Sequence, residues 1–238
     1  MFPLRDDNPV SITPVVTWAL ILVNVAVFVY QLSLTPRDAQ LFAFQFGAIP
    51  AVVLGTKGLP AQYVVIPPLI SVFTSMFLHG GFLHLVGNMW FLWIFGNNIE
   101  DAMGHVRFLV FYLVCGILAS ASHIASDPAS GIPSIGASGA IAGVMGAYIM
   151  LYPRARVWTL IFLGFFVRMI YLPAGVILGF WILLQFINGS MTAGNPNMGG
   201  VAFWAHIGGF IAGVLLVGLF KKRGVRFFNP PHYSAEAY

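Results

Sequence analysis

Long apolar runs limit what this chain can fold into more than any other feature of its sequence. Stretches such as VVTWALILVNVAVFVYQL and VRFLVFYLVCGILASA approach the length of about 20 residues that a helix needs to cross a bilayer. Only 8% of the residues are charged, against roughly 25% in soluble domains, and the mean hydropathy is +0.88. The chain is therefore predicted to be an integral membrane protein.

The apolar runs predict six membrane-spanning helices. The long connection at 35–81 consists of apolar pieces interrupted by proline and glycine, and we expect it to lie partly in the membrane interface. The apolar stretch at 156–168 is a candidate for a seventh span, which we favour less because Arg168 closes it and Pro173 follows. The six predicted spans are 14–34, 82–99, 106–125, 138–152, 170–187 and 202–220.

The basic residues predict the orientation. Six spans put both termini on one side, and if that side is the cytoplasm, only Arg37 and Lys57 of the 11 Lys and Arg residues lie outside. This is a strong positive-inside bias. We therefore expect a cytoplasmic N-terminal tail (1–13), a six-helix domain (14–220) and a cytoplasmic C-terminal tail (221–238), which is basic at first and then flexible. Ser138 then faces the extracytoplasmic side.

The acidic residues and the cysteine exclude several classes of site. All seven acidic residues fall in tails, loops or span ends, which argues against a proton-coupled transporter with an intramembrane carboxylate. An aspartyl dyad and an H-E-x-x-H zinc site are absent from the sequence as well. Cys115 is the single cysteine, so no intrachain disulfide or thiolate cluster forms. We expect no cofactor and no metal. We also expect no nucleic-acid partner, because the net charge of +4 reflects topology.

Polar side chains remain at the predicted spans, and four of them are candidates for a shared site. His84 and Asn88 are four residues apart in HLVGN and project from one helix face, Ser138 opens the fourth span, and His206 opens the sixth. Such groups should face the bundle interior or a water-filled cavity. Each has a plain structural alternative: a membrane serine is usually a packing residue, His84 and Asn88 can be interhelical hydrogen bonds, and His206 can stabilise a helix end.

Glycine spacing favours a shared site over these alternatives. Small residues at intervals of four let helix backbones approach closely. Close packing of the fourth and sixth spans would bring Ser138 and His206 together, and a serine within reach of an imidazole is the minimum for an activated nucleophile. Without an intramembrane acid this would be a dyad. The glycines that predict this packing are Gly139, Gly143, Gly209 and Gly213.

The motifs HLVGN, GASGA and AHIGGFIAG follow one another in this order along the chain. In this the sequence resembles the rhomboid family of intramembrane serine proteases. The stretch NNIEDAMGHVRFLVFYL is similar to the family's connection between its second and third helices. The resemblance covers residues 73–220. It implies an all-α, six-transmembrane-helix bundle with a partly membrane-embedded first loop, and a mobile fifth helix that admits substrate.

The resemblance also implies residue roles. Ser138 is then the nucleophile and His206 the general base, while the side chains of His84 and Asn88 and the backbone N–H of Ser138 surround the oxyanion. The implied partners are single-span membrane proteins, which are cleaved near the extracytoplasmic side, and the lipid bilayer itself. Some family members have a tyrosine that packs on the catalytic histidine, and here that position is Ala142. What orients the His206 ring is therefore unassigned.

Helix length predicts the depth of the serine. The 15 residues of 138–152 reach only about 22 Å, whereas the hydrocarbon core is about 30 Å thick. If Arg154 and Arg156 hold the far end in the cytoplasm, Ser138 lies below the outer surface. A cavity open to the outside would then supply water.

Two other functions stay open. A non-catalytic rhomboid-like scaffold that binds membrane proteins would typically lack the serine or the histidine, and both are present. A small-solute channel or transporter is a third interpretation, which the lack of an obvious repeat and of a charged pathway disfavours. The expected location is the cytoplasmic membrane of a bacterium, and the sequence leaves the oligomeric state open.

Overall fold

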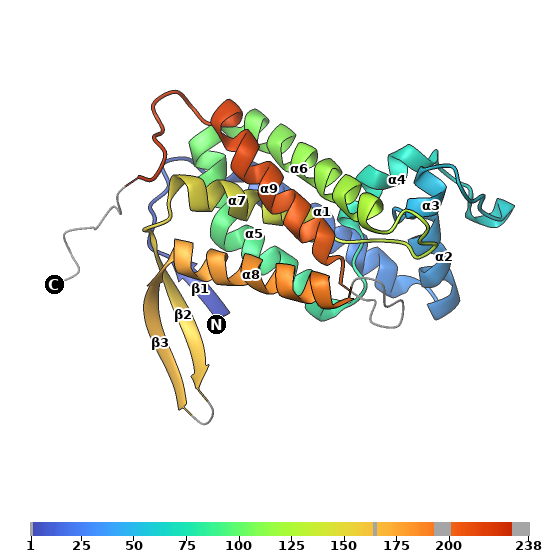
Figure 1. The fold of residues 1–238 in the computed structure, drawn as a ribbon, viewed down its shortest axis with the longest axis horizontal. Coiled ribbons are helices and arrows are strands. Elements are labelled where there is room, and N and C mark those ends of the chain that lie inside the picture. Colours follow the sequence, from blue (N-terminus) through green and yellow to red (C-terminus); the bar gives the residue numbers. More distant parts are fainter. Residues whose placement is uncertain (1, 164–165, 193–200, 230–238) are drawn as a thin grey trace.

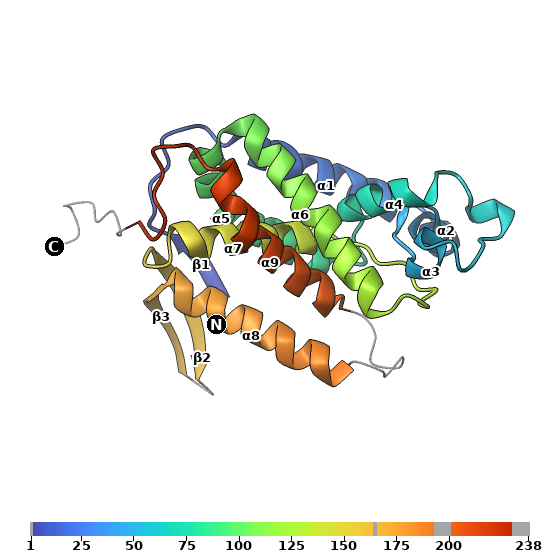
Figure 2. The same ribbon diagram turned by 45° about the horizontal axis from the view of Figure 1, so that its top comes forward.

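The computed structural model describes residues 2–163, 166–192 and 201–229, and these form a mostly helical bundle (Figure 1). The helical fold class predicted from the apolar runs is confirmed. Figure 2 shows α1 and α8 on opposite flanks, with α7 between them. The longer helices are α1 (Val15–Ser33), α5 (Phe82–Met103), α6 (His105–Ser126), α7 (Ser138–Leu151), α8 (Ala174–Thr192) and α9 (Phe203–Phe220).

The number of membrane spans stays a prediction. In the described part of the chain, four helices are long and apolar enough to cross a membrane, namely α1, α6, α8 and α9. A fifth candidate is α5 together with the short helices before it, which meet it at a bend of 80°. Helix α7 has only 14 residues, about 21 Å, and is shorter than the hydrocarbon core is thick.

Five short helices occupy the long connection between α1 and α5. Prolines begin three of them, because proline at a first helical position loses no helix hydrogen bond. They gather at one end of the bundle, on the right in Figure 1. These elements are α2 (Pro36–Phe46), α3 (Pro50–Val53), the 3-10 helix η1 (Ala61–Tyr63), α4 (Pro68–Thr74) and the 3-10 helix η2 (Ser75–Phe77).

A three-stranded antiparallel sheet lies at the other end, and the sequence did not predict it. Strand β1 (Phe2–Asp6) pairs with β2 (Arg156–Leu163), which pairs with β3 (Phe166–Pro173) in the order β1-β2-β3. The candidate seventh span at 156–168 is therefore wrong, and the fifth predicted span begins at Ala174 rather than at residue 170. A short apolar run does not distinguish a strand from a helix, and the β-branched and aromatic residues of RVWTLIFL favour the strand.

Glu100 joins three helices at the end of the bundle that carries the sheet. Its side chain is fully buried. The carboxylate accepts hydrogen bonds from the backbone N–H of Val16 (2.9 Å) and of Thr17 (2.7 Å), and from the Thr17 hydroxyl (2.7 Å). It also lies 2.6 Å from Nδ1 of His105, which begins α6. Because the N-cap residue of α1 is Pro14, with no side-chain cap, Glu100 satisfies the first N–H groups of that helix instead.

Both ends of the described chain lie at this same end of the bundle. Strand β1 pairs with β2, which follows α7, and Asn229 donates its N–H to the carbonyl of Leu151 at the end of α7 (2.8 Å). The N–H of Lys222 likewise binds the carbonyl of Ala102 near the end of α5 (2.8 Å). Ser138 begins α7 at its opposite end. The predicted flexible tail begins at 221, and its residues 230–238 lie outside the described residues.

Candidate active site

Ser138 is the first residue of α7, at a helix start with free backbone donors. The first hydrogen bond of this helix runs from the N–H of Ile141 to the carbonyl of Ala137 (3.0 Å), so the helix does not use the N–H groups before Ile141. Gly136 precedes this start with φ +131°, a conformation that L side chains rarely adopt. Its N–H binds the carbonyl of Ser75 (2.8 Å), which fixes the loop. The helix start thus offers donors to a developing negative charge.

His206 of α9 meets this serine. Its Nε2 lies 2.8 Å from Oγ of Ser138, and its side chain is buried. The two residues are 68 positions apart in the sequence, and they meet because α7 and α9 pack closely. The distance is that of a hydrogen bond between a nucleophile and its general base.

Glycine contacts explain how α7 and α9 come so close. A Cβ atom added to Gly209 would collide with the carbonyl oxygen of Gly139, and one added to Gly213 would collide with that of Gly143. All four glycines predicted to pack therefore lie along this contact. The backbones touch where any side chain would hold the helices apart.

His84 of α5 borders the serine, and Asn88 lies one turn further along the same helix. The N–H of Gly80 points to Nδ1 of His84 at 3.4 Å, so Nε2 of that ring carries the proton and is a donor. A Cβ added to Gly136 would lie 2.9 Å from Nε2 of His84 and 3.7 Å from Oγ of Ser138, so both groups border the same small space. Nδ2 of Asn88 lies 2.9 Å from Nε2 of His79, and its second hydrogen is not needed for that bond.

Two site residues were missed in the sequence. His79 is not among the predicted site residues, yet it is 2% exposed and touches both Asn88 and the His84 ring, whose centroid is 5.1 Å away. Gln185 of α8 was not considered, and its Oε1 lies 2.8 Å from Nδ1 of His206. A signal existed, because Gln185 is the one amide side chain in the predicted span at 170–187, where polar groups are costly.

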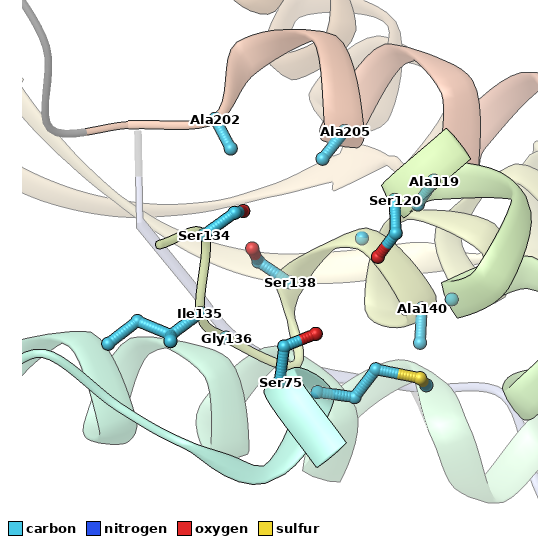
Figure 3. A pocket seen from close by; sticks show the side chains of 13 residues that line it. Ser75, Ala119, Ser120, Ser134, Ile135, Gly136, Ser138, Ala140, Ala202 and Ala205 are labelled. Carbon is cyan, nitrogen blue, oxygen red and sulfur yellow. The ribbon is translucent and has the colours of Figure 1, made fainter. Parts of the chain in front are cut away.

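A small cavity opens beside the serine. Figure 3 shows the Ser138 side chain pointing into it, among other hydroxyl groups. Its volume is about 20 Å³, which is room for about one water molecule. Among its lining residues are Ser75, Ser120, Ser134, Gly136 and Ala205. A hydroxyl paired with an imidazole, unused N–H groups and space for water are the groups that acyl transfer requires.

Comparison with known proteins gives one family. A model of the Rhomboid domain matches residues 68–223. The chain is 30% identical over 150 residues to "Rhomboid protein 1, mitochondrial" of Saccharomyces cerevisiae. The aligned residues are 61% of this chain and 40% of that protein. It is 34% identical over 109 residues to "Presenilin-associated rhomboid-like protein, mitochondrial" of Homo sapiens. These residues are 45% of this chain and 28% of that protein.

A bacterial protein is also similar. "Rhomboid protease GluP" of Bacillus subtilis is 36% identical over 154 residues, which are 63% of this chain and 27% of that protein. The chain thus spans well under half of the length of these three relatives.

Proposed function

The chain belongs to the rhomboid family, and we propose that it is an intramembrane serine endopeptidase. The proposed substrates are single-span membrane proteins, cut in their transmembrane segments near the extracytoplasmic side. The observation that carries the proposal is the 2.8 Å contact between Ser138 Oγ and His206 Nε2 at the start of α7. A rhomboid-like scaffold without activity would not need this contact.

The proposed reaction begins with proton transfer. Nε2 of His206 takes the proton from Ser138 Oγ as that oxygen bonds to the scissile carbonyl carbon. The carbonyl electron pair moves to oxygen, where the Ser138 N–H, the His84 Nε2–H and the Asn88 amide donate hydrogen bonds. His206 then gives the proton to the leaving nitrogen as the C–N bond breaks. Water attacks the resulting ester, with His206 again as base, and releases the acid and free Ser138.

The geometry of the substrate follows from this site. A peptide carbonyl inside a regular helix is hydrogen-bonded and shielded, so the substrate must unwind locally before Oγ can reach it. Residues that weaken a helix, such as glycine, would lower the free energy of that unwinding by up to about 1 kcal/mol each. We therefore propose that substrates carry such residues beside the cleaved bond.

We also propose the bacterial cytoplasmic membrane as location, with both termini in the cytoplasm. The distribution of basic residues supports this orientation. The relative from Bacillus subtilis supports a bacterial membrane, whereas the relatives from Saccharomyces cerevisiae and Homo sapiens are named as mitochondrial.

Activity-based labelling tests the proposed nucleophile. We expect a fluorophosphonate probe to label the purified wild-type protein at Ser138, as mapped by mass spectrometry, because His206 makes that oxygen nucleophilic. Ser138→Ala and His206→Ala should lose both labelling and cleavage of a single-span reporter. Thr35→Ala, a hydroxyl removed at the exposed start of α2, is the matched control and should keep both. Reporter cleavage by Ser138→Ala at the wild-type rate would contradict the mechanism.

A further inference from the structure

Gln185 of α8 stands where a serine protease triad has its carboxylate. We propose that Gln185 is a positioning residue, which holds His206 in the one tautomer that can accept the proton of Ser138. The proposal rests on the proposed function and adds a third member to the predicted dyad. It also answers what orients the His206 ring when Ala142 cannot.

The first step is the orientation of the Gln185 amide. Its Nε2 lies 3.3 Å from the backbone carbonyl oxygen of Trp181, one helical turn earlier. A carbonyl oxygen only accepts, so the NH₂ group must face it. The opposite orientation would set two acceptors against each other. The amide oxygen Oε1 therefore points away from the helix, toward His206.

The second step is the proton on the imidazole. Oε1 of Gln185 lies 2.8 Å from Nδ1 of His206, and this oxygen also only accepts. A hydrogen bond at this distance requires the proton to be on Nδ1. The lone pair of the neutral ring is then on Nε2, which lies 2.8 Å from Ser138 Oγ. In the other tautomer, a lone pair on Nδ1 would face Oε1, and the Nε2–H could not accept the serine proton.

The third step is the ring orientation. The ring of Trp181 packs against His206 with centroids 5.6 Å apart and planes inclined by 38°. Trp181 and Gln185 are four residues apart and project from the same face of α8. Together they hold the imidazole by its face and by its edge. Both contacts come from one helix, so α8 as a unit positions the general base.

The chemistry suits a neutral acceptor. Gln185 is buried, with 8% of its surface exposed, and a carboxylate there would have to be desolvated. The amide oxygen avoids that charge while the enzyme rests. When His206 gains a proton during the reaction, the same oxygen accepts a bond from a cation, which strengthens it. The group thus helps most in the transition state.

Two substitutions separate this role from simple packing. In the full-length protein, Gln185→Met keeps an unbranched side chain of similar length but removes the acceptor. Gln185→Glu keeps an acceptor at the same reach, and because burial favours the neutral carboxyl, its O–H can donate to the Trp181 carbonyl in place of the amide. Asn188→Leu is the matched control, because it removes an amide from the same helix, three residues away. The measurements are the rate of fluorophosphonate labelling, kcat and KM for a single-span reporter, the melting temperature, and the ¹⁵N spectrum of the histidines, with His206→Ala assigning the signal.

We expect Gln185→Met to lower the labelling rate and kcat by about 10- to 100-fold, the range for losing a buried hydrogen-bond partner, with KM within about twofold. Gln185→Glu should recover most of the rate, and Asn188→Leu should stay within about twofold of wild type. In the ¹⁵N spectrum the wild-type Nδ1 of His206 should carry the proton, and Gln185→Met should show a mixture of tautomers.

Two results would overturn the proposal. One is labelling of Gln185→Met at the wild-type rate. The other is an equal loss in the Met and Glu variants with an unchanged ¹⁵N pattern, which would mean that Gln185 only packs. Absence of any labelling in the wild type would instead reject the proposed protease function. The ¹⁵N pattern would then decide by itself whether Gln185 fixes the tautomer.

Discussion

At the scale of single residues, Asp6 couples the N-terminal strand to the helix that begins with Ser138. The Tyr148 hydroxyl of α7 donates a hydrogen bond to Oδ2 of Asp6 (2.5 Å). Burial raises the pKa of Asp6 to about 7, the adjacent Asp7 adds to the rise, and the bond from Tyr148 opposes it. The charge of Asp7 is neutralised by Arg156, whose Nε lies 2.7 Å from Oδ2 of Asp7. Asp6 is thus a carboxyl group that titrates near neutral pH.

This shift predicts how stability depends on pH. A carboxyl group with a raised folded-state pKa stabilises the fold fully below its unfolded pKa of about 3.8, and this contribution is lost as the pH rises through about 7. We expect the melting temperature of the wild type, relative to that of Asp6→Asn, which cannot ionise, to fall between pH 5.5 and pH 8. Relative to that of the exposed Asp38→Asn, it should stay constant over the same range. Equal pH dependence in the wild type and Asp6→Asn would contradict the assignment.

Motif residues of the candidate site could be predicted, whereas the contacts that their supporting residues make could not. Short motifs contain the four predicted residues, and the order of these motifs along the chain resembles that of the rhomboid family. The four residues are Ser138, His206, His84 and Asn88. Gln185 stands in no motif and reaches His206 only through the packing of α8 on α9. A contact between side chains on different helices depends on helix rotation and depth, which one sequence does not specify. The roles of all five residues remain proposals.

At the scale of elements, the contact between α7 and α9 depends on glycines that have no room for a side chain. The backbone of α9 rests directly on that of α7, with Gly209 against the carbonyl oxygen of Gly139. His206 is three residues before Gly209, on the same stretch of α9. The distance between Ser138 and His206 is therefore set by how closely these two helices approach.

The glycine contact predicts opposite effects of one substitution at two positions. Gly209→Ala should lower the free energy of unfolding by about 1–3 kcal/mol, because the added Cβ collides with backbone, and it should also slow labelling of Ser138. Gly179→Ala on α8 is the control, because no atom lies within 4 Å of the added Cβ and alanine favours a helix by up to about 1 kcal/mol. Unfolding in detergent measures the free energy of unfolding of both variants. Equal stability of the two variants would show that the helices can separate without cost.

At the scale of the whole molecule, sequence patterns predicted the helices well and the sheet not at all. Periodic or continuous apolar runs mark each long helix, although boundaries moved by several residues, as at Ala174. The strands β2 and β3 are also apolar, and β1 lies in the segment predicted as the N-terminal tail. Pairing between β1 and β2 joins residues about 150 positions apart, which no local pattern reveals.

The common position of the two chain ends predicts which positions react from each side of a membrane. We expect Arg226→Cys, in a Cys115→Ala background, to react with a membrane-impermeant maleimide only from the cytoplasmic side. Lys57→Cys, in the exposed connection at the opposite end, should react only from the other side. Sealed vesicles of both orientations provide the measurement, and Cys115 alone, which is fully buried, is the unreactive control. Reaction of both cysteines from one side would reject the topology.

The pairing of β1 with β2 has a consequence for the timing of biosynthesis. Phe2 leaves the ribosome before its partner Leu160, which follows 158 residues later. At about 5–20 residues per second, strand β1 waits about 10 to 30 s without a partner while the helices from α1 to α7 are synthesised. Closure of the sheet is then a late event in folding. An N-terminal fusion that delays this pairing should lengthen the period in which the young chain is open to quality-control proteases.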